Sequence, residues 1–437
     1  MKSIPVFQVL VLCLMSLVSP LLLGSGFALY EGSARGNVLG GLTGHGDDAA
    51  AVFFNPAGIT NLEGKHFMGG VTVISPFADL TTTSIYGGPT TEASYEDNLF
   101  TPPHIYYTKQ YSEKIWFGFG LFSRFGLGSE FKKGWAGRYS NVNTTIETLT
   151  LNANVAYKVN DKVSLAFGLD AIWIDVRLEQ DIDASRFLTE PHNNPDTTAY
   201  DATQVIEGDN VGYGFNAAGF FRPNDRWSFG LSYNSKVKQE IDDGVARYQK
   251  PQAPVPFNWF VDTNVAAEPI DLPEMLFLGG AYRVSDRLGI GGGAVFTAWS
   301  ALDELVFNYE TPFLVVPGLG VAVDRASREL RWKDVWRYNL GFEYRLNDRW
   351  ELMWGFTYDE SPLNDQTISY LLPANDRTLY NLGFSRQFDK WLLECSFNYL
   401  QIKDRTIDNR QLEEGVLAGD VTNGGAYLLG FSMSRRL

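Results

Sequence analysis

The chain has 437 residues, a formal net charge of −15 and an aromatic content of 14%. This acidic balance argues against a nucleic-acid partner and is typical of a cell-surface protein with acidic loops, which divalent cations can bridge to anionic lipopolysaccharide. A soluble chain of this length normally forms two or three domains, whereas an outer-membrane β-barrel of this length is a single closed sheet.

The N-terminus has the layout of a secretory signal peptide. An apolar run from Ile4 to Leu23 follows the lone Lys2, and small residues follow it at once. We place the cleavage after Gly24, so the signal peptide spans residues 1–24. A membrane anchor is the alternative, but no basic stop-transfer cluster follows the run.

The two cysteines give no structural framework. Cys13 lies inside the signal, and Leu12 stands where a lipoprotein signal requires a small residue. Cys395 is then the single cysteine of the mature chain, which excludes an internal disulfide. No other stretch is apolar over the roughly 18 residues that a transmembrane helix needs, so the sequence excludes a helical membrane protein.

Residues 25–66 break the strand-like pattern of the rest of the chain. They are rich in glycine and contain Asp47-Asp-Ala-Ala-Ala-Val-Phe-Phe-Asn-Pro-Ala-Gly58. Asp47 or Asp48 can cap a short helix, and Asn55 before Pro56 ends it because a residue before proline avoids the helical region. The segment is too short to fold alone, so we expect a small hatch packed in the lumen of a barrel.

A recurring turn punctuates the remainder. It reads Arg222-Pro-Asn-Asp-Arg-Trp227 and Arg345-Leu-Asn-Asp-Arg-Trp350, with looser copies at 109–115, 158–163, 283–288 and 386–391. Asn or Ser at its centre can bond its own backbone, which is typical of a tight hairpin. Six short turns on the side that holds both chain ends require fourteen strands and seven longer outer loops.

Between the turns, aromatic and aliphatic residues alternate with polar ones, as a wall between lipid and a polar lumen requires. The alternation Trp336, Tyr338, Leu340, for example, leaves Arg337 and Asn339 facing the lumen. We expect strands, within residues 67–437, at 67–79, 103–111, 115–124, 144–159, 162–179, 206–222, 226–240, 272–284, 287–300, 334–346, 349–358, 377–387, 391–402 and 424–437. The fold class is therefore all-β, a 14-stranded antiparallel transmembrane barrel of the outer membrane with a partly helical N-terminal hatch.

The third of these strands is rich in glycine, with Gly118, Gly120 and Gly126 among its residues. Glycine in a strand permits a bulge or a bend. Alternatively, these glycines leave a smooth inner wall beside the hatch.

One outer loop carries Pro254-Val-Pro-Phe257-Asn-Trp259-Phe260, and other loops carry Phe187-Leu188 and Phe313-Leu-Val-Val316. Apolar loop surface indicates capture of hydrophobic ligands, although the same residues could pack a loop core.

The final strand places Tyr427, Leu429, Phe431, Met433 and the terminal Leu437 on one face. This pattern resembles the C-terminal signal read by the outer-membrane assembly machinery. That signal usually ends in Phe, so Leu437 is a departure from it.

Several motifs in this order resemble the outer-membrane long-chain fatty acid transporters of the FadL/TodX type. They are Ser25-Gly-Phe-Ala-Leu, Asp47-Asp-Ala with Asn55-Pro-Ala-Gly58, Gly208-Asp-Asn-Val-Gly-Tyr-Gly-Phe-Asn216, Leu272-Pro-Glu-Met275, Ala298-Trp-Ser300, Lys333-Asp-Val-Trp-Arg337 and Tyr358-Asp-Glu-Ser-Pro362. The resemblance covers nearly the whole chain and implies the same barrel and hatch. It implies passive uptake of hydrophobic molecules, with long-chain fatty acids ahead of aromatic hydrocarbons. A general polar porin is the alternative from another class.

The resemblance also implies a route and site residues. Ligands would land on the outer loops, at Phe257, Trp259 and Phe260, move to a lumenal pocket at Phe27, and leave sideways at a kink in the third strand, beside Gly118, Gly120 and Gly126. A fatty acid needs a cation for its carboxylate because an unpaired buried charge is unfavourable. Arg177 and Lys333 are the candidates, with ordinary solvation as the alternative for each. Asn55, Pro56 and Ala57 form the hatch motif.

An enzyme has little support. His45, His66, His104 and His192 lack metal-ligand spacing, and the nucleophile elbow Gly-x-Ser-x-Gly is absent from the sequence. Gly289-Ile-Gly-Gly-Gly-Ala294 lies within strand alternation, so we interpret it as strand rather than a dinucleotide turn. We expect a monomer without a cofactor or a metal.

Overall fold

The computed structural model describes residues 26–83, 90–96, 98–188, 198–255, 259–316, 321–408 and 418–437. The predicted signal peptide and Phe257 therefore lie outside the described residues. None of the helices in these ranges is long and apolar enough to cross a membrane.

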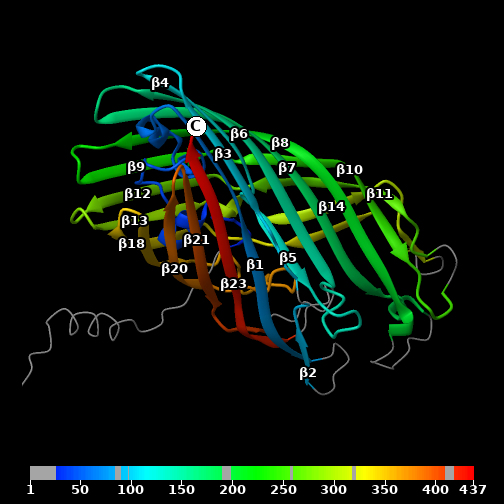
Figure 1. The fold of residues 1–437 in the computed structure, drawn as a ribbon. Helices are drawn as coiled ribbons and strands as arrows, with labels where there is room; N and C mark the ends of the chain where they lie inside the picture. Colours follow the sequence, from blue (N-terminus) through cyan, green and yellow to red (C-terminus); the bar gives the residue numbers. More distant parts are fainter. Residues whose placement is uncertain are drawn as a thin grey trace, which may run out of the picture.

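Fourteen antiparallel strands form one closed wall, each hydrogen-bonded to the next, and the last pairs with the first (Figure 1). Closure leaves no free edge, which is what a sheet in lipid requires. In order, the wall strands are β1 (Lys65–Thr83), β3 (Pro103–Gln110), β4 (Ile115–Phe122), β6 (Asn143–Lys158), β7 (Val163–Asp183), β8 (Asp201–Phe221), β9 (Trp227–Asn234), β12 (Met275–Arg283), β13 (Leu288–Thr297), β18 (Val335–Asn347), β19 (Trp350–Asp359), β20 (Arg377–Phe388), β21 (Trp391–Ile402) and β23 (Gly419–Arg436). The predicted fold class and strand number are confirmed.

The repeated turn has the geometry that its sequence predicts. The side-chain oxygen of Asn224 accepts hydrogen bonds from the backbone N–H groups of Arg226 and Trp227, at 2.9 and 3.0 Å. Asn160, Asn347, Ser112 and Ser285 make the same pair of bonds in their own turns. One local side-chain motif therefore closes five of the six hairpins.

Further strands lie at the loop end of the barrel: β2 (Thr90–Ser94), β5 (Gly126–Glu130), β10 (Val237–Gln249), β11 (Thr263–Leu272), β14 (Glu304–Tyr309), β15 (Leu314–Val316), β16 (Val321–Val323), β17 (Arg325–Glu329) and β22 (Arg405–Ile407). The predicted strand 226–240 is wrong in its second half. It divides into β9 and β10. β10 leaves the wall and pairs with the first residues of β8 and with β11. Asn234, Ser235 and Lys236 are polar and interrupt the alternation, but they include neither glycine nor proline to mark a turn, so the prediction merged the two strands.

The outward face of the wall is apolar. Leu151, Leu165, Leu169 and Leu382 are among its most exposed side chains. On the C-terminal strand Tyr427, Leu429, Phe431 and Met433 are exposed together, as the alternation predicts. A continuous exposed apolar band is the signature of contact with lipid.

The hatch fills the lumen at the end that carries the short turns and the C-terminus (Figure 1, blue). It contains α2 (Ala34–Leu39), α3 (Ala51–Phe54) and the 3₁₀ helix η1 (Pro56–Asn61); further 3₁₀ turns in the loops are η2 (Ala184–Phe187), η3 (Thr198–Tyr200) and η4 (Trp299–Ala301). Ser33 caps α2 by accepting a hydrogen bond from the N–H of Gly36, and Gly40 ends it with φ of 72°. The hatch packs its apolar residues against the inner wall: Val52 and Phe53 share a core with Tyr106, Trp116 and Phe122.

Candidate functional site

A cavity of about 430 Å³ lies between the start of the hatch and the inner wall. Most of its lining is apolar. Arg337 and Arg377 bring positive charge to it, and Glu31 and the exposed Glu147 bring negative charge. The hatch contributes Gly26, Ala28, Leu29, Tyr30 and Glu31; the wall and loops contribute, among others, Ile74, Phe100, Phe125, Leu127, Ile146, Leu149, Trp173, Leu379, Leu400 and Leu428. Its volume falls within the roughly 300–1,000 Å³ of small-molecule sites, and we name it the central cavity.

The wall is interrupted beside this cavity. β4 ends at Phe122, paired with Thr150 of β6, and β5 starts at Gly126, paired with Glu147. Gly126 is four positions after Phe122, whereas their partners Thr150 and Glu147 on β6 are only three positions apart. The segment between β4 and β5 therefore carries one extra residue, as in a β-bulge. The pairing of β3 with β4 also stops at Phe122, so β3 does not cover β5.

The first residues of the hatch occupy this interruption. The N–H of Leu29 donates to the carbonyl of Arg124, and the N–H of Gly126 donates to the carbonyl of Phe27, each at 2.8 Å. Ala28 and Phe125 form an isolated antiparallel bridge. We name residues 26–31 the hatch start. It acts as a short added strand at the place where the wall is broken.

The central cavity reaches residues of the outward face. Leu149 and Trp173 line it, and Trp173 is 36% exposed, in the same alternating row as the lipid-facing Leu165 and Leu169. The cavity therefore extends from the hatch start to the outer surface of the wall, along the interruption between β4 and β5.

Phe27 lies in an aromatic cluster next to the cavity. Its ring centroid is 4.6 Å from Trp299, 5.8 Å from Trp332 and 6.0 Å from Phe125, and the side chain is 4% exposed. Its neighbours Gly26 and Ala28 line the cavity, whereas the Phe27 side chain is packed behind them. Trp299 belongs to the motif Ala298-Trp-Ser300, and Trp332 directly precedes the motif Lys333-Asp-Val-Trp-Arg337.

Arg177 and Lys333, the two cations predicted to bind a carboxylate, lie outside the central cavity. Arg177 forms ion pairs with Glu207 and with Glu179 on the extracellular part of the barrel. Lys333 is exposed, and its backbone N–H donates to the carbonyl of Pro362 at 2.9 Å. The described residues that line the central cavity include neither side chain. Sequence reasoning missed Arg337 as a site residue, although strand alternation already placed it on the lumenal face.

The three glycines of the third strand have different surroundings. A Cβ atom at Gly118 would lie 3.0 Å from Ile59 and Val52 of the hatch, and one at Gly120 would lie 3.0 Å from Val52. Both belong to the unbroken strand β4 and let the hatch approach closely. Gly126 begins β5, directly after the interruption, and a Cβ there would meet Leu29 of the hatch start at 2.9 Å.

The hatch motif joins hatch and wall through one buried amide. The Asn55 side chain is 0% exposed, accepts a hydrogen bond from the N–H of Ala57, and donates to the carbonyls of Thr43 and Gly219 at 3.0 and 3.1 Å. Pro56 follows at the first position of η1. A backbone N–H at this position would have no hydrogen-bond partner within the helix, so proline, which lacks the N–H, is tolerated there.

The apolar loop residues form a core at the loop end of the barrel. Trp259 and Phe260 are 2% and 1% exposed and pack with Tyr309, Phe313 and Leu314. Phe187 meets the Trp259 ring edge-on at 6.1 Å, and it lines a neighbouring cavity of about 290 Å³ together with Ile182, Ile206, Phe307 and Leu371. Trp259 and Phe260 thus support this outer cavity from within the loops, and Phe187 contacts it directly.

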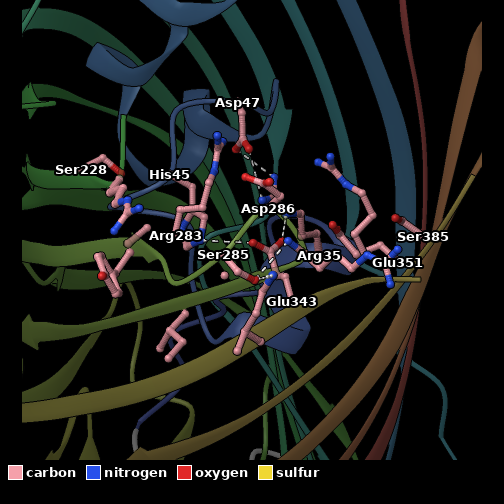
Figure 2. Close-up of a pocket in the computed structure, with 18 of the residues that line it drawn as sticks. Arg35, His45, Asp47, Ser228, Arg283, Ser285, Asp286, Glu343, Glu351 and Ser385 are labelled. Carbon is pink, nitrogen blue, oxygen red and sulfur yellow. Dashed lines mark hydrogen bonds and ion pairs between the residues drawn. The ribbon is translucent and has the colours of Figure 1, made fainter. Parts of the chain in front are cut away.

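A polar cavity of about 570 Å³ opens between the hatch and the short turns (Figure 2). At its centre Arg35 of α2 donates from Nε to Glu343 of β18 at 2.6 Å and from Nη1 to Asp47 at 2.9 Å. His45 lies 3.7 Å from the same glutamate, and burial lowers the pKa of this histidine. We name Arg35, Asp47 and Glu343 the hatch latch, because they tie the hatch to the wall at the end of the barrel that carries the short turns.

A closed wall with an apolar outer face, a lumen filled by a hatch, and an apolar cavity that reaches the lipid face define an outer-membrane β-barrel of the transport class. Residues 15–437 match the family described as outer membrane protein transport protein (OMPP1/FadL/TodX), and the chain belongs to that family. The members of this family are transport proteins and not enzymes. The protein is located in the outer membrane.

The relatives agree with this assignment. The chain is 26% identical over 402 residues to a long-chain fatty acid transport protein of Escherichia coli, with 86% of each chain covered. It is 26% identical over 444 residues to outer membrane protein P1 of Haemophilus influenzae, with 92% of each covered. Among solved structures, a Pseudomonas aeruginosa FadL homologue has a TM-score of 0.78 at 19% identity, covering 95% of this chain and 100% of that one. The Pseudomonas putida toluene transporter TodX has a TM-score of 0.69 at 15% identity, covering 95% and 100%. These two structures share the fold with the chain.

Proposed function

We propose that the protein takes up long-chain fatty acids passively across the outer membrane. The observation that carries the proposal is the central cavity, which is mainly apolar and runs from the hatch start to the lipid-facing surface. A hydrophobic molecule in this cavity has a path into the bilayer that avoids both the polar hatch latch and water. Burial of apolar ligand surface supplies the driving force for entry, at about 25 cal/mol per Å².

The route has three steps. The ligand is first captured at the outer cavity beside Phe187, above the core that Trp259 and Phe260 form. It then moves to the central cavity next to Phe27. Finally the hatch start leaves the interruption between β4 and β5, and the ligand passes sideways into the membrane at Gly126. The two backbone hydrogen bonds of Leu29 and Gly126 are the contacts that this last step must break.

The substrate class rests on two considerations. The relative from E. coli named above is a fatty acid transport protein, and cationic groups line one side of the cavity. Aromatic hydrocarbons are the second candidate, because most of the lining is apolar and a hydrocarbon needs no cation. Equilibrium binding of oleate and of toluene to the purified protein separates the two candidates. A protein that binds toluene but not oleate would overturn the choice of fatty acids.

A reversible cross-link tests the lateral route. Ala28 and Phe125 are bridge partners, and the Cα atoms of such partners are about 4.5–5.5 Å apart, within reach of a disulfide. With Cys395→Ala as background, Ala28→Cys combined with Phe125→Cys should close the interruption when oxidised. We expect oleate uptake to stop on oxidation and to recover on reduction.

The matched control is the pair Ala153→Cys and Leu169→Cys, which joins two wall strands that are already in register. Its oxidation should leave uptake unchanged. Undiminished uptake through the oxidised Ala28–Phe125 pair would show that the ligand does not leave by this route.

A further inference from the structure

We propose that Arg337 holds the carboxylate of the ligand inside the central cavity. The assignment rests on the proposed fatty-acid function and names the residue that selects an acid over a neutral hydrocarbon. Arg337 lies on the lumenal face of β18, lines the central cavity and is 5% exposed. It comes from the wall, so it does not move with the hatch.

A row of three charged residues across adjacent strands fixes this guanidinium. Arg337 on β18 is the register partner of Asp359 on β19, and Asp359 is the register partner of Arg377 on β20. Nη1 of Arg337 donates to Asp359 Oδ2 at 3.0 Å, and Nη2 of Arg377 donates to the same oxygen at 3.1 Å. Because Asp359 is 0% exposed, it works as an internal support and does not face the ligand.

The hatch start covers one face of the same group. The Arg337 guanidinium lies 4.1 Å from the centroid of the Tyr30 ring, and Tyr30 also lines the cavity. A guanidinium stacked on an aromatic face keeps its in-plane N–H groups available for an anion. The guanidinium is thus held in a fixed orientation between a strand partner and a ring.

Arg337 has donor capacity that the protein leaves unused. Its Nε is buried and has no hydrogen-bond partner among the described residues. This atom is not exposed to the cavity, so a carboxylate oxygen reaches it only when the packing around Arg337 opens slightly. The charge-assisted hydrogen bond would then satisfy a donor that is unfavourable when unpaired. Arg177, by contrast, is already paired with two glutamates outside the cavity.

A purely structural role for Arg337 is the competing explanation, since the ion pair with Asp359 could simply maintain the register of β18 and β19. The two roles differ in selectivity. A register clamp would weaken the binding of every ligand alike, whereas a head-group contact affects only ligands that carry a carboxylate.

The test compares oleate with methyl oleate, which has the same chain without the charge. In Arg337→Met the support Asp359 keeps its bond to Arg377, so no carboxylate is left without a cation. We expect oleate affinity to fall about tenfold or more, as for loss of a charge-assisted hydrogen bond, and methyl oleate affinity to change less than about twofold. Arg177→Met and Lys333→Met are matched controls and should leave the oleate to methyl oleate ratio of the wild type.

The outcomes distinguish the proposals. Wild-type protein that binds neither lipid overturns the proposed function and the head-group assignment with it. Wild-type protein that prefers oleate, with the same preference in Arg337→Met, overturns only the role of Arg337. If Arg337→Met does not fold, Arg337→Gln keeps a neutral side chain that can donate a hydrogen bond to Asp359 and leaves the Asp359–Arg377 ion pair in place, and the preference for oleate must again disappear.

Discussion

The rings of Phe27 and Trp299 meet edge to face with their centroids 4.6 Å apart. This contact joins the hatch start to a loop that follows β13, far along the chain. Aromatic pairs of this geometry contribute about 0.5–1.5 kcal/mol beyond their buried area. The aromatic cluster around Phe27 therefore helps to keep the hatch start in the interruption of the wall.

Phe27→Ala should loosen the hatch start. Removing a buried phenylalanine ring typically destabilises its surroundings by about 3–5 kcal/mol, because the neighbouring side chains only partly fill the space. We expect faster amide hydrogen exchange at Leu29 and Gly126, whose N–H groups hold the hatch start in place. Phe388→Ala, at an exposed phenylalanine of β20, is the control. Unchanged exchange at both amides would mean that the aromatic cluster does not anchor this segment.

Asn55→Ala should detach part of the hatch from the wall. The substitution removes three hydrogen bonds and leaves the carbonyls of Thr43 and Gly219 and the N–H of Ala57 without this partner. Each such loss costs about 1–3 kcal/mol. We expect faster exchange at Ala57 and easier proteolysis of the hatch. Asn61→Ala, at the exposed end of η1, should have little effect, and equal behaviour of the two variants would contradict a special role for Asn55.

Deletion of residues 25–60 should open the lumen to ions. The hatch fills the barrel at its periplasmic end, so the full chain should show little steady single-channel current, and the deletion should raise it. Circular dichroism of the deletion variant checks that the wall still forms. A full chain that conducts persistently would favour the general polar porin instead, and equal conductance of the two forms would rule out the hatch as the plug.

Much of the wall could be predicted from sequence because its determinants are local. The hydrogen bonds of Asn224 involve only the backbone N–H groups two and three positions later. The number of hairpins can therefore be predicted from the number of copies of the motif. The alternation that exposes Leu151 and Leu169 depends only on the period of the strand. The strand number and the lipid-facing rows were therefore accessible without tertiary information.

The site depended on contacts that are distant in sequence. Ser123 and Arg124 are two polar residues in succession and break the alternation, but nothing local shows that Ala28 pairs with Phe125 at this place. The same holds for Arg337, whose lumenal orientation followed from the pattern but whose approach to Asp359 and Tyr30 did not. Trp259 and Phe260 form an apolar run that predicts either a surface or a core, and only packing with Phe313 decides for a core.

Asp376 should make stability depend on pH. It precedes β20 in an extracellular loop, and its Oδ1 accepts a hydrogen bond from the N–H of Ser361 at 2.7 Å. Burial raises the pKa of this carboxyl to about 6, although the Ser361 N–H and the nearby Lys403, Lys333 and Arg405 oppose the shift. The folded protein therefore binds this proton more tightly than the unfolded chain does. The stabilisation is complete below about pH 4, the ordinary range of an aspartate, and is lost as the pH rises through about 6.

Asp376→Asn keeps an oxygen acceptor for Ser361 and removes the titration. Relative to this variant, the wild type should become less stable as the pH rises from 4 to 7, whereas below pH 4 the difference should stay constant. Thermal unfolding of both proteins across this range measures the difference and cancels the other carboxylates. Asp348→Asn, at an exposed aspartate of a periplasmic turn, controls for the loss of one charge. The opposite result, a wild type that gains stability relative to Asp376→Asn as the pH rises, would contradict this prediction. It would mean that the basic neighbours lower the pKa of Asp376 by more than burial raises it.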